Sequence, residues 1–157
     1  MLPRSFACAT ALAAYAAVCT GCLARNHIQH EGPYLFTAQQ VLGNNCGLRA
    51  DSSGLWSGVM LITGDLIHMQ MDEGLYGMEA EGYFLYGVEQ FTLDGTAPDI
   101  ANQVSGLPCE VDRAQAHVDA ITDSSTTFHG SARVELHRTD LTSCSCLLGV
   151  HFTASMQ

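Results

Sequence analysis

Apolar and polar residues alternate along most of this 157-residue chain beyond residue 33. The clearest example is residues 126–136, where every second position is apolar or small and the positions between them are polar. A period of two places successive side chains on opposite faces of an extended strand, whereas an amphipathic helix repeats every three to four residues. The pattern therefore predicts a half-buried β-strand, with Phe128, Val134 and Leu136 inward and Arg133 and Glu135 outward.

The same alternation predicts further strands at residues 34–42, 55–63, 66–71, 78–88, 90–93 and 146–154. Residues 111–121 fit either a strand or an alanine-rich helix, and we favour the strand because residues 122–127 then form a hairpin turn into the next one. Turn sequences such as Asp94-Gly95 separate the apolar runs. The chain is thus predicted to be all-β, either a small antiparallel β-barrel or a two-sheet β-sandwich of about eight strands.

The N-terminal residues follow a different pattern. Arg4 precedes an uncharged, alanine-rich run over residues 5–23, which is too short for a membrane span and is typical of a secretory signal peptide. The run ends in Val18-Cys19-Thr20-Gly21-Cys22. This ending resembles the lipobox of bacterial lipoproteins, in which a small residue precedes a cysteine that is lipidated and becomes the mature N-terminus.

The resemblance implies that Cys22 carries the lipid and that a membrane of the cell envelope is the partner of the anchor. Leu23 after that cysteine is similar to the outer-membrane class of the family. We therefore expect a signal peptide over residues 1–21, a lipidated cysteine and polar tether over residues 22–33, and a single β domain over residues 34–157. The alternative is ordinary cleavage after Ala24, which leaves a soluble secreted protein.

The charge balance is strongly acidic. All six basic residues are arginines, sixteen residues are carboxylates, and the formal net charge is −10 at pH 7. Between Arg49 and Arg113 the chain has carboxylates but neither arginine nor lysine. Because phosphate backbones require a basic face, this composition argues against nucleic acid as a partner.

Four cysteines belong to the predicted β domain: Cys46, Cys109, Cys144 and Cys146. Export leads to an oxidising compartment, where an even number of thiols is typical of disulfides. Alternate residues of an extended segment lie about 6.6 Å apart, so Cys144 and Cys146 are not expected to pair with each other. We expect two bridges, each joining one of this C-terminal pair to Cys46 or Cys109. A four-cysteine zinc site is the less favoured alternative, because the spacing lacks paired two-residue gaps.

The sequence holds no nucleophile elbow, paired-histidine metalloprotease motif, phosphate loop or dinucleotide fingerprint, so no catalytic residue, metal or cofactor is predicted. The candidate ligand surface consists of Glu79, Glu81 and Tyr83 on the polar side of one strand, with Trp56 at the start of another. For these aromatic residues, packing against a second sheet is favoured over ligand binding. Outward histidines at 117, 129 and 137 are expected to meet only partners across strands, and His117 should lie near Ser131 or Arg133.

Two functions follow from these features. The favoured one is a non-catalytic envelope lipoprotein whose acidic β domain binds a ligand or partner or has a structural role. The alternative is an envelope hydrolase that uses carboxylates between Asp72 and Glu89. Burial distinguishes them, since a catalytic acid needs a pocket that raises its pKa and a binding face leaves its carboxylates solvated.

Overall fold

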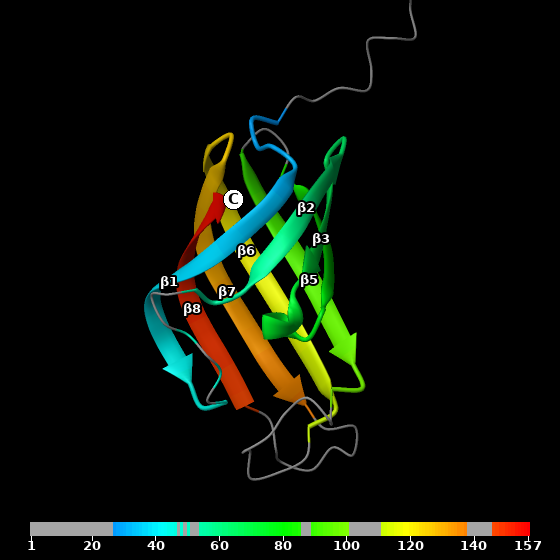
Figure 1. The fold of residues 1–157 in the computed structure, drawn as a ribbon, viewed down its shortest axis with the longest axis vertical. Coiled ribbons are helices and arrows are strands. Elements are labelled where there is room, and N and C mark those ends of the chain that lie inside the picture. Colours follow the sequence, from blue (N-terminus) through cyan, green and yellow to red (C-terminus); the bar gives the residue numbers. More distant parts are fainter. Residues whose placement is uncertain are drawn as a thin grey trace, which may run out of the picture.

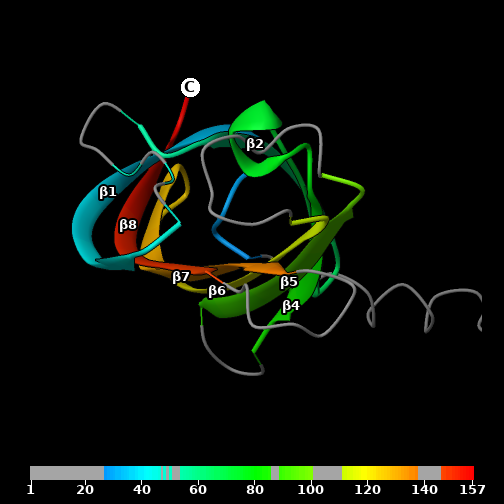
Figure 2. The same ribbon diagram turned by 90° about the horizontal axis from the view of Figure 1, so that it is seen from below.

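The computed structural model describes residues 27–46, 48, 50, 54–85, 89–100, 111–137 and 146–157, which form one closed barrel of eight antiparallel strands. The strands are β1 (Gly32–Asn44), β2 (Ser57–Thr63), β3 (Leu66–Met71), β4 (Glu79–Phe84), β5 (Gln90–Pro98), β6 (Arg113–Ser124), β7 (Thr127–His137) and β8 (Cys146–Met156), with a 3-10 turn, η1 (Glu73–Leu75), between β3 and β4. Each strand pairs with the next, and β8 pairs with β1 to close the ring (Figures 1 and 2). The predicted all-β class is confirmed, and the architecture is the barrel.

The predicted alternation is confirmed over most of the barrel wall. In β6 buried and exposed residues alternate from Arg113 to Asp123, so residues 111–121 are strand rather than helix from Arg113 onward. In β7, Phe128, Val134 and Leu136 are fully buried as predicted. Inward and outward positions could therefore be assigned from the period of two alone.

The prediction of a turn at Asp94-Gly95 is wrong, because β5 continues through both residues to Pro98. Gly95 faces the interior, where a Cβ atom would lie 2.6 Å from Sδ of Met78. The glycine is therefore required by the packing of a neighbouring side chain and not by a turn. A glycine within a strand has this meaning as often as it marks a chain reversal.

Aromatic rings fill the interior. The ring centroid of Phe36 lies 5.0 Å from that of Phe152 and 5.6 Å from that of Phe128. Each interior phenylalanine of β5, β7 and β8 is paired across strands with a residue that has little or no side chain: Phe91 with Ala120, Phe128 with Ala154, and Phe152 with Gly130. Alternation of large and small residues lets the opposed faces of a narrow barrel interdigitate.

The barrel has two unequal sides. The long wall, β5 to β8, contains strands of 9 to 12 residues, whereas the short wall, β2 to β4, contains strands of 6 or 7. The short wall fills its interior largely with methionine, since Met60 is paired with Met69 and Met71 lies beside them. Strand β1 connects the two walls and completes the ring, and its pairing with β8 contains two register shifts.

The chain before β1 is packed against the upper end of the barrel, the end that carries the β2–β3 and β6–β7 turns in Figure 1. Gln29 is buried and donates a 2.5 Å hydrogen bond to the hydroxyl of Tyr34, which in turn donates to the carbonyl of His30 at 2.7 Å. Burial raises the pKa of this tyrosine. Part of the stretch predicted as a polar tether is therefore structural, because Gln29 is buried and hydrogen-bonded to Tyr34 of β1.

Candidate functional site

The residues predicted as a ligand surface do not lie together. Glu79, Glu81 and Tyr83 are exposed on the outer face of β4, in agreement with the strand parity. Trp56 is only 4% exposed, and its ring lies 5.8 Å from that of Phe36 in the interior. Trp56 is therefore a core residue that packs in the interior and does not belong to a ligand surface.

The carboxylates between Asp72 and Glu89 are dispersed rather than gathered. Asp72 caps the η1 turn by accepting from the backbone N–H of Gly74 at 2.9 Å, and it also accepts from the N–H and hydroxyl of Ser57. The side chain of Glu81 is 80% exposed and lies 3.5 Å from His68. These are structural and solvated positions, and a carboxyl that acts as a catalytic acid requires burial.

The described residues line a groove on the outside of the long wall, with a volume of about 650 Å³. We call it the outer-wall groove. Its polar lining comes from outward positions of β6, β7 and β8: Asp119, His129, Ser131, His151 and Thr153. Leu85, Gln90 and Ile121 border it toward the upper end of the barrel, and Gln39 of β1 borders it on the side of β8. A small-molecule site commonly combines an apolar surface with a few converging polar groups in this way.

The geometry of the groove follows from strand register and from one glycine. Asp119 of β6 is opposite Ser131 of β7, which is opposite His151 of β8, so the three side chains form a row across the wall. The next residue up the strand, Gly130, exposes its backbone as the floor of the groove. A Cβ atom at Gly130 would overlap the carbonyl oxygen of Asp119, so glycine alone permits this close approach of β6 and β7.

Histidine–carboxylate pairs surround the groove. Nδ1 of His129 lies 2.8 Å from Oδ1 of Asp123. Nδ1 of His117 lies 2.7 Å from Oδ1 of Asp94, and its Nε2 lies 3.2 Å from Oδ2 of Asp119. The hydrogen bond that Asp94 accepts from His117, together with the charges of Asp119 and Asp94, raises the pKa of His117 above its ordinary value, against the opposing effect of burial. His117 is opposite Arg133, one of the two neighbours predicted for it.

The row of Asp119, Ser131 and His151 contains the residue types of a hydrolytic triad, but the contacts differ. In such a triad the histidine is bonded to both the nucleophile and the acid. Among the described residues, Asp119 is instead bonded to His117, and no hydrogen bond joins Ser131 to His151. The ranges that the structure describes also hold no cluster of three His, Cys, Asp or Glu side chains suited to a metal ion.

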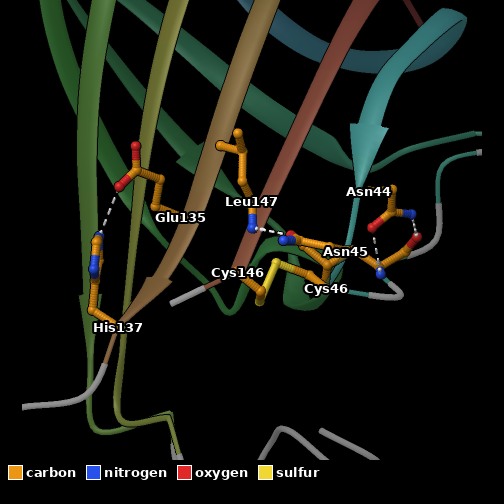
Figure 3. The surroundings of a disulfide bond; sticks show 8 residues. Asn44, Asn45, Cys46, Glu135, His137, Cys146 and Leu147 are labelled. Atoms are coloured by element: carbon orange, nitrogen blue, oxygen red, sulfur yellow. Dashed lines mark hydrogen bonds and ion pairs between the residues drawn. A yellow bond between two sulfur atoms is a disulfide. The ribbon is translucent and has the colours of Figure 1, made fainter. Parts of the chain in front are cut away.

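A disulfide joins the lower ends of β1 and β8. Cys46, just after β1, is bonded to Cys146 at the start of β8, with the two Cα atoms 4.9 Å apart (Figure 3). Beside it, Oδ1 of Asn45 accepts a 2.6 Å hydrogen bond from the N–H of Leu147. The expectation that Cys146 bonds to one of the two earlier cysteines is confirmed. Cys109 and Cys144 lie outside the described residues.

Sequence reasoning identified the strands of the groove and its outward residues, but it did not single out Asp119, Ser131 or His151 as a site. These residues are 12 and 20 positions apart in the chain and come together only when the register of three strands is known. The usable signal was the outward parity of His129 and its neighbours. A polar row on a barrel wall leaves no local motif, because adjacent strands contribute one residue each.

No protein family model matches the chain, and no curated protein matches it. The helical part of the described ranges includes no segment with the length and hydrophobicity needed to cross a bilayer.

Proposed function

We propose that this chain is a non-catalytic lipoprotein of the bacterial envelope, anchored through Cys22, whose barrel binds a small amphipathic molecule in the outer-wall groove. The groove is the observation that supports the binding role. It offers imidazole, hydroxyl and carboxylate groups in one row, with Leu85 and Ile121 at its upper border. A molecule with an apolar part and several hydrogen-bonding groups matches this lining.

The packing of the interior supports an external site. An eight-stranded barrel is just wide enough either to be filled by side chains or to hold one small ligand. In this barrel the rings of Phe36, Phe91, Phe128 and Phe152 are in mutual contact across the interior, with centroid separations of 5.0 to 6.1 Å. The space that a ligand would need inside is taken by these rings. The outer wall is the remaining place for a binding site of this size.

The hydrolase alternative receives less support from the geometry. Asp72 caps a turn, Glu81 faces solvent and Oε2 of Glu89 lies 3.7 Å from Nδ1 of His27, and no carboxylate of the Asp72–Glu89 region lines the outer-wall groove. Enzymes that hydrolyse with two carboxylates hold them on either side of the reacting bond, with at least one pKa raised by its surroundings. We therefore propose binding rather than catalysis.

Replacement of the anchor cysteine tests the proposed attachment to the membrane. The Cys22→Ser variant is expected to move from the membrane fraction to the soluble fraction of the envelope, while its circular dichroism stays that of a folded β-barrel. Mass spectrometry of the wild-type N-terminus should find the added lipid. Unchanged membrane association of the variant, together with an unmodified wild-type N-terminus, would contradict the anchor.

A small neutral amphiphile tests the groove. Octyl glucoside, added below its critical micelle concentration to the Cys22→Ser protein, is expected to shift the imidazole NMR signals of His129 and His151 in a saturable manner. Ser131→Trp should abolish the shifts, because the indole fills the groove without entering the core. Gln70→Trp, on the outer face of β3, is the matched control and should preserve them. Shifts that never saturate, or that survive Ser131→Trp, would exclude the groove as the binding site.

A further inference from the structure

The outward residues of β3 and β4 are separated by polarity along each strand, whereas on β2 the exposed Val59 lies below Leu61 and the polar Thr63 lies above it. On β4 the order is Glu79, Glu81 and then Tyr83, so the polar part lies toward the η1 turn and the aromatic residue toward the upper end. On β3, Leu66 is at the upper end and Gln70 at the lower end. Chance placement of exposed apolar residues would scatter them, and single scattered ones need no explanation.

The apolar residues at the upper end form one surface, which we call the apolar rim: Ile28, Leu61, Leu66, Tyr83 and Leu85. Their exposed fractions are 49%, 52%, 64%, 53% and 38%. Leu66 is directly paired with Tyr83 across β3 and β4, and Leu61 is two residues from Thr63, the partner of Leu66 on β2. Side chains in such positions lie within about 5 to 8 Å of each other, so Leu61, Leu66, Tyr83 and Leu85 are contiguous, and Ile28 belongs to the N-terminal segment at the same end of the barrel.

The N-terminal segment is fixed at this same end of the barrel (Figure 1). The ring of His27 stacks on Phe84 with a centroid distance of 3.5 Å, and its Nε2 lies 3.1 Å from Asp65 in the β2–β3 turn. Glu31 accepts a 2.6 Å hydrogen bond from the backbone N–H of Ile62. The side chain of His27 is only 2% exposed, so the first described residue is held beside the rim.

The length of chain before His27 limits how far the rim can be from the anchor. Cys22 precedes His27 by five positions, and five residues span at most about 18 Å even when fully extended. A lipid on Cys22 therefore keeps the upper end of the barrel within about 18 Å of the bilayer that holds the lipid. The lower end, with the disulfide, faces away.

We propose that the apolar rim rests on the bilayer that holds the lipid anchor, with Leu61, Leu66 and Tyr83 at the boundary between headgroups and acyl chains. This inference rests on the proposed anchor at Cys22. Tyrosine is favoured at that depth because its ring is apolar and its hydroxyl reaches the polar layer. The contact fixes the orientation of the barrel, so that the outer-wall groove begins near the membrane at Leu85 and Ile121.

The chemistry of the rim points to uncharged lipid contact. Of the arginines in the described ranges, Arg113 begins β6 at the lower end and Arg133 lies on the long wall, so the rim contains no described arginine. Binding that depends on anionic lipid uses clusters of basic residues. Asp65, next to Leu66, is about half exposed, so the contact is expected to form on phosphatidylcholine and to weaken with added anionic lipid at low salt.

Fluorescence quenching in vesicles tests the proposal on the full lipidated protein. Tyr83→Trp and Glu79→Trp are each reconstituted into phosphatidylcholine vesicles whose acyl chains carry bromine, and the signal of the wild-type protein, from buried Trp56, is subtracted. The new tryptophan of Tyr83→Trp should lose about half of its emission or more, because the rim lies at the acyl boundary. Glu79→Trp is the matched control on the same face of the same strand, about 13 Å away, and should be unaffected.

Two further readouts separate the possible failures. If mass spectrometry finds no lipid on the mature N-terminus, the proposed anchor fails and the inference fails with it. If the lipid is present and Tyr83→Trp is quenched no more than Glu79→Trp, the inference alone is overturned. Sedimentation of the Cys22→Ser protein supplies the other check, since a dimer that Leu66→Glu dissociates would assign the rim to a second copy of the chain.

Discussion

The long wall and the short wall of the barrel solve the same packing problem in different ways. The long wall sets each phenylalanine opposite an alanine or glycine, so every ring has one defined place. The short wall sets Met60 against Met69 and places Met71 nearby, and methionine adapts to irregular gaps through its three rotatable bonds. The comparison indicates that the long wall depends on specific packing of its rings, whereas the short wall tolerates changes of side-chain shape.

The largest expected effect concerns the most connected ring of the long wall. Phe128 is fully buried and its ring lies 5.1 to 6.1 Å from those of Tyr34, Phe36, Phe91 and Phe152. Phe128→Ala should lower the free energy of unfolding by about 3–5 kcal/mol, because the surrounding rings cannot collapse into the space. Urea denaturation of the Cys22→Ser form measures the loss.

The matched substitution on the short wall is Met69→Leu, which nearly preserves side-chain volume among flexible neighbours. It should cost less than about 1.5 kcal/mol. Glu135→Ala, a half-buried outward position of β7, should be close to neutral. Equal losses for Phe128→Ala and Met69→Leu would mean that the two walls do not differ in the way their packing suggests.

The second prediction concerns the seam where the long wall meets β1. The Cys46–Cys146 bond joins residues 100 positions apart at the lower end of the β1–β8 pairing. Cys46→Ser/Cys146→Ser should lower the free energy of unfolding by about 2–4 kcal/mol, because the cross-link restricts the unfolded chain. The short wall has no such bond within its described residues, so hydrogen exchange should increase mainly in the lower halves of β1 and β8.

Thiol labelling complements this measurement. In the unreduced, denatured mature protein, Cys46, Cys109, Cys144 and Cys146 should all resist labelling, as expected for two bridges. Labelling of Cys46 or Cys146 would contradict the observed bond. Four reactive thiols that zinc protects would instead support the metal site.

The sequence allowed the wall residues to be assigned to inside and outside, because a period of two is a local property of each strand. Closure of the ring was not predictable in the same way. Alternation is identical in a barrel and a sandwich, and the deciding contact joins β1 to β8 from opposite ends of the chain. The N-terminal segment was expected to be a polar tether exposed to solvent. Instead, Gln29 and the side chain of His27 are buried, because they contact residues in turns that are distant in the sequence.

The candidate site shows the same limit. The outward position of His129 followed from its parity, but the groove depends on Gly130 and on the register that aligns Asp119 with His151 through Ser131. Trp56 precedes its strand but shares the inward parity of Gly58 and Met60, so the period of two is consistent with its place in the core. Local pattern thus predicts which face a residue occupies, and register determines its neighbours.

The smallest expected effect distinguishes the charged long wall from the apolar rim of the short wall. Asp94 contributes most to raising the pKa of His117, and Asp119 contributes less. A folded pKa above the unfolded value of about 6.5 means that the pair stabilises the protein fully below that pH, and that the stabilisation is lost as pH rises through the folded pKa. Since the His117 side chain is about half exposed, the effect should be on the order of a few tenths of a kcal/mol. NMR titration of the His117 imidazole should give a lower pKa in Asp94→Asn and a smaller decrease in Asp119→Asn, and the opposite order would assign the shift to the groove-side carboxylate.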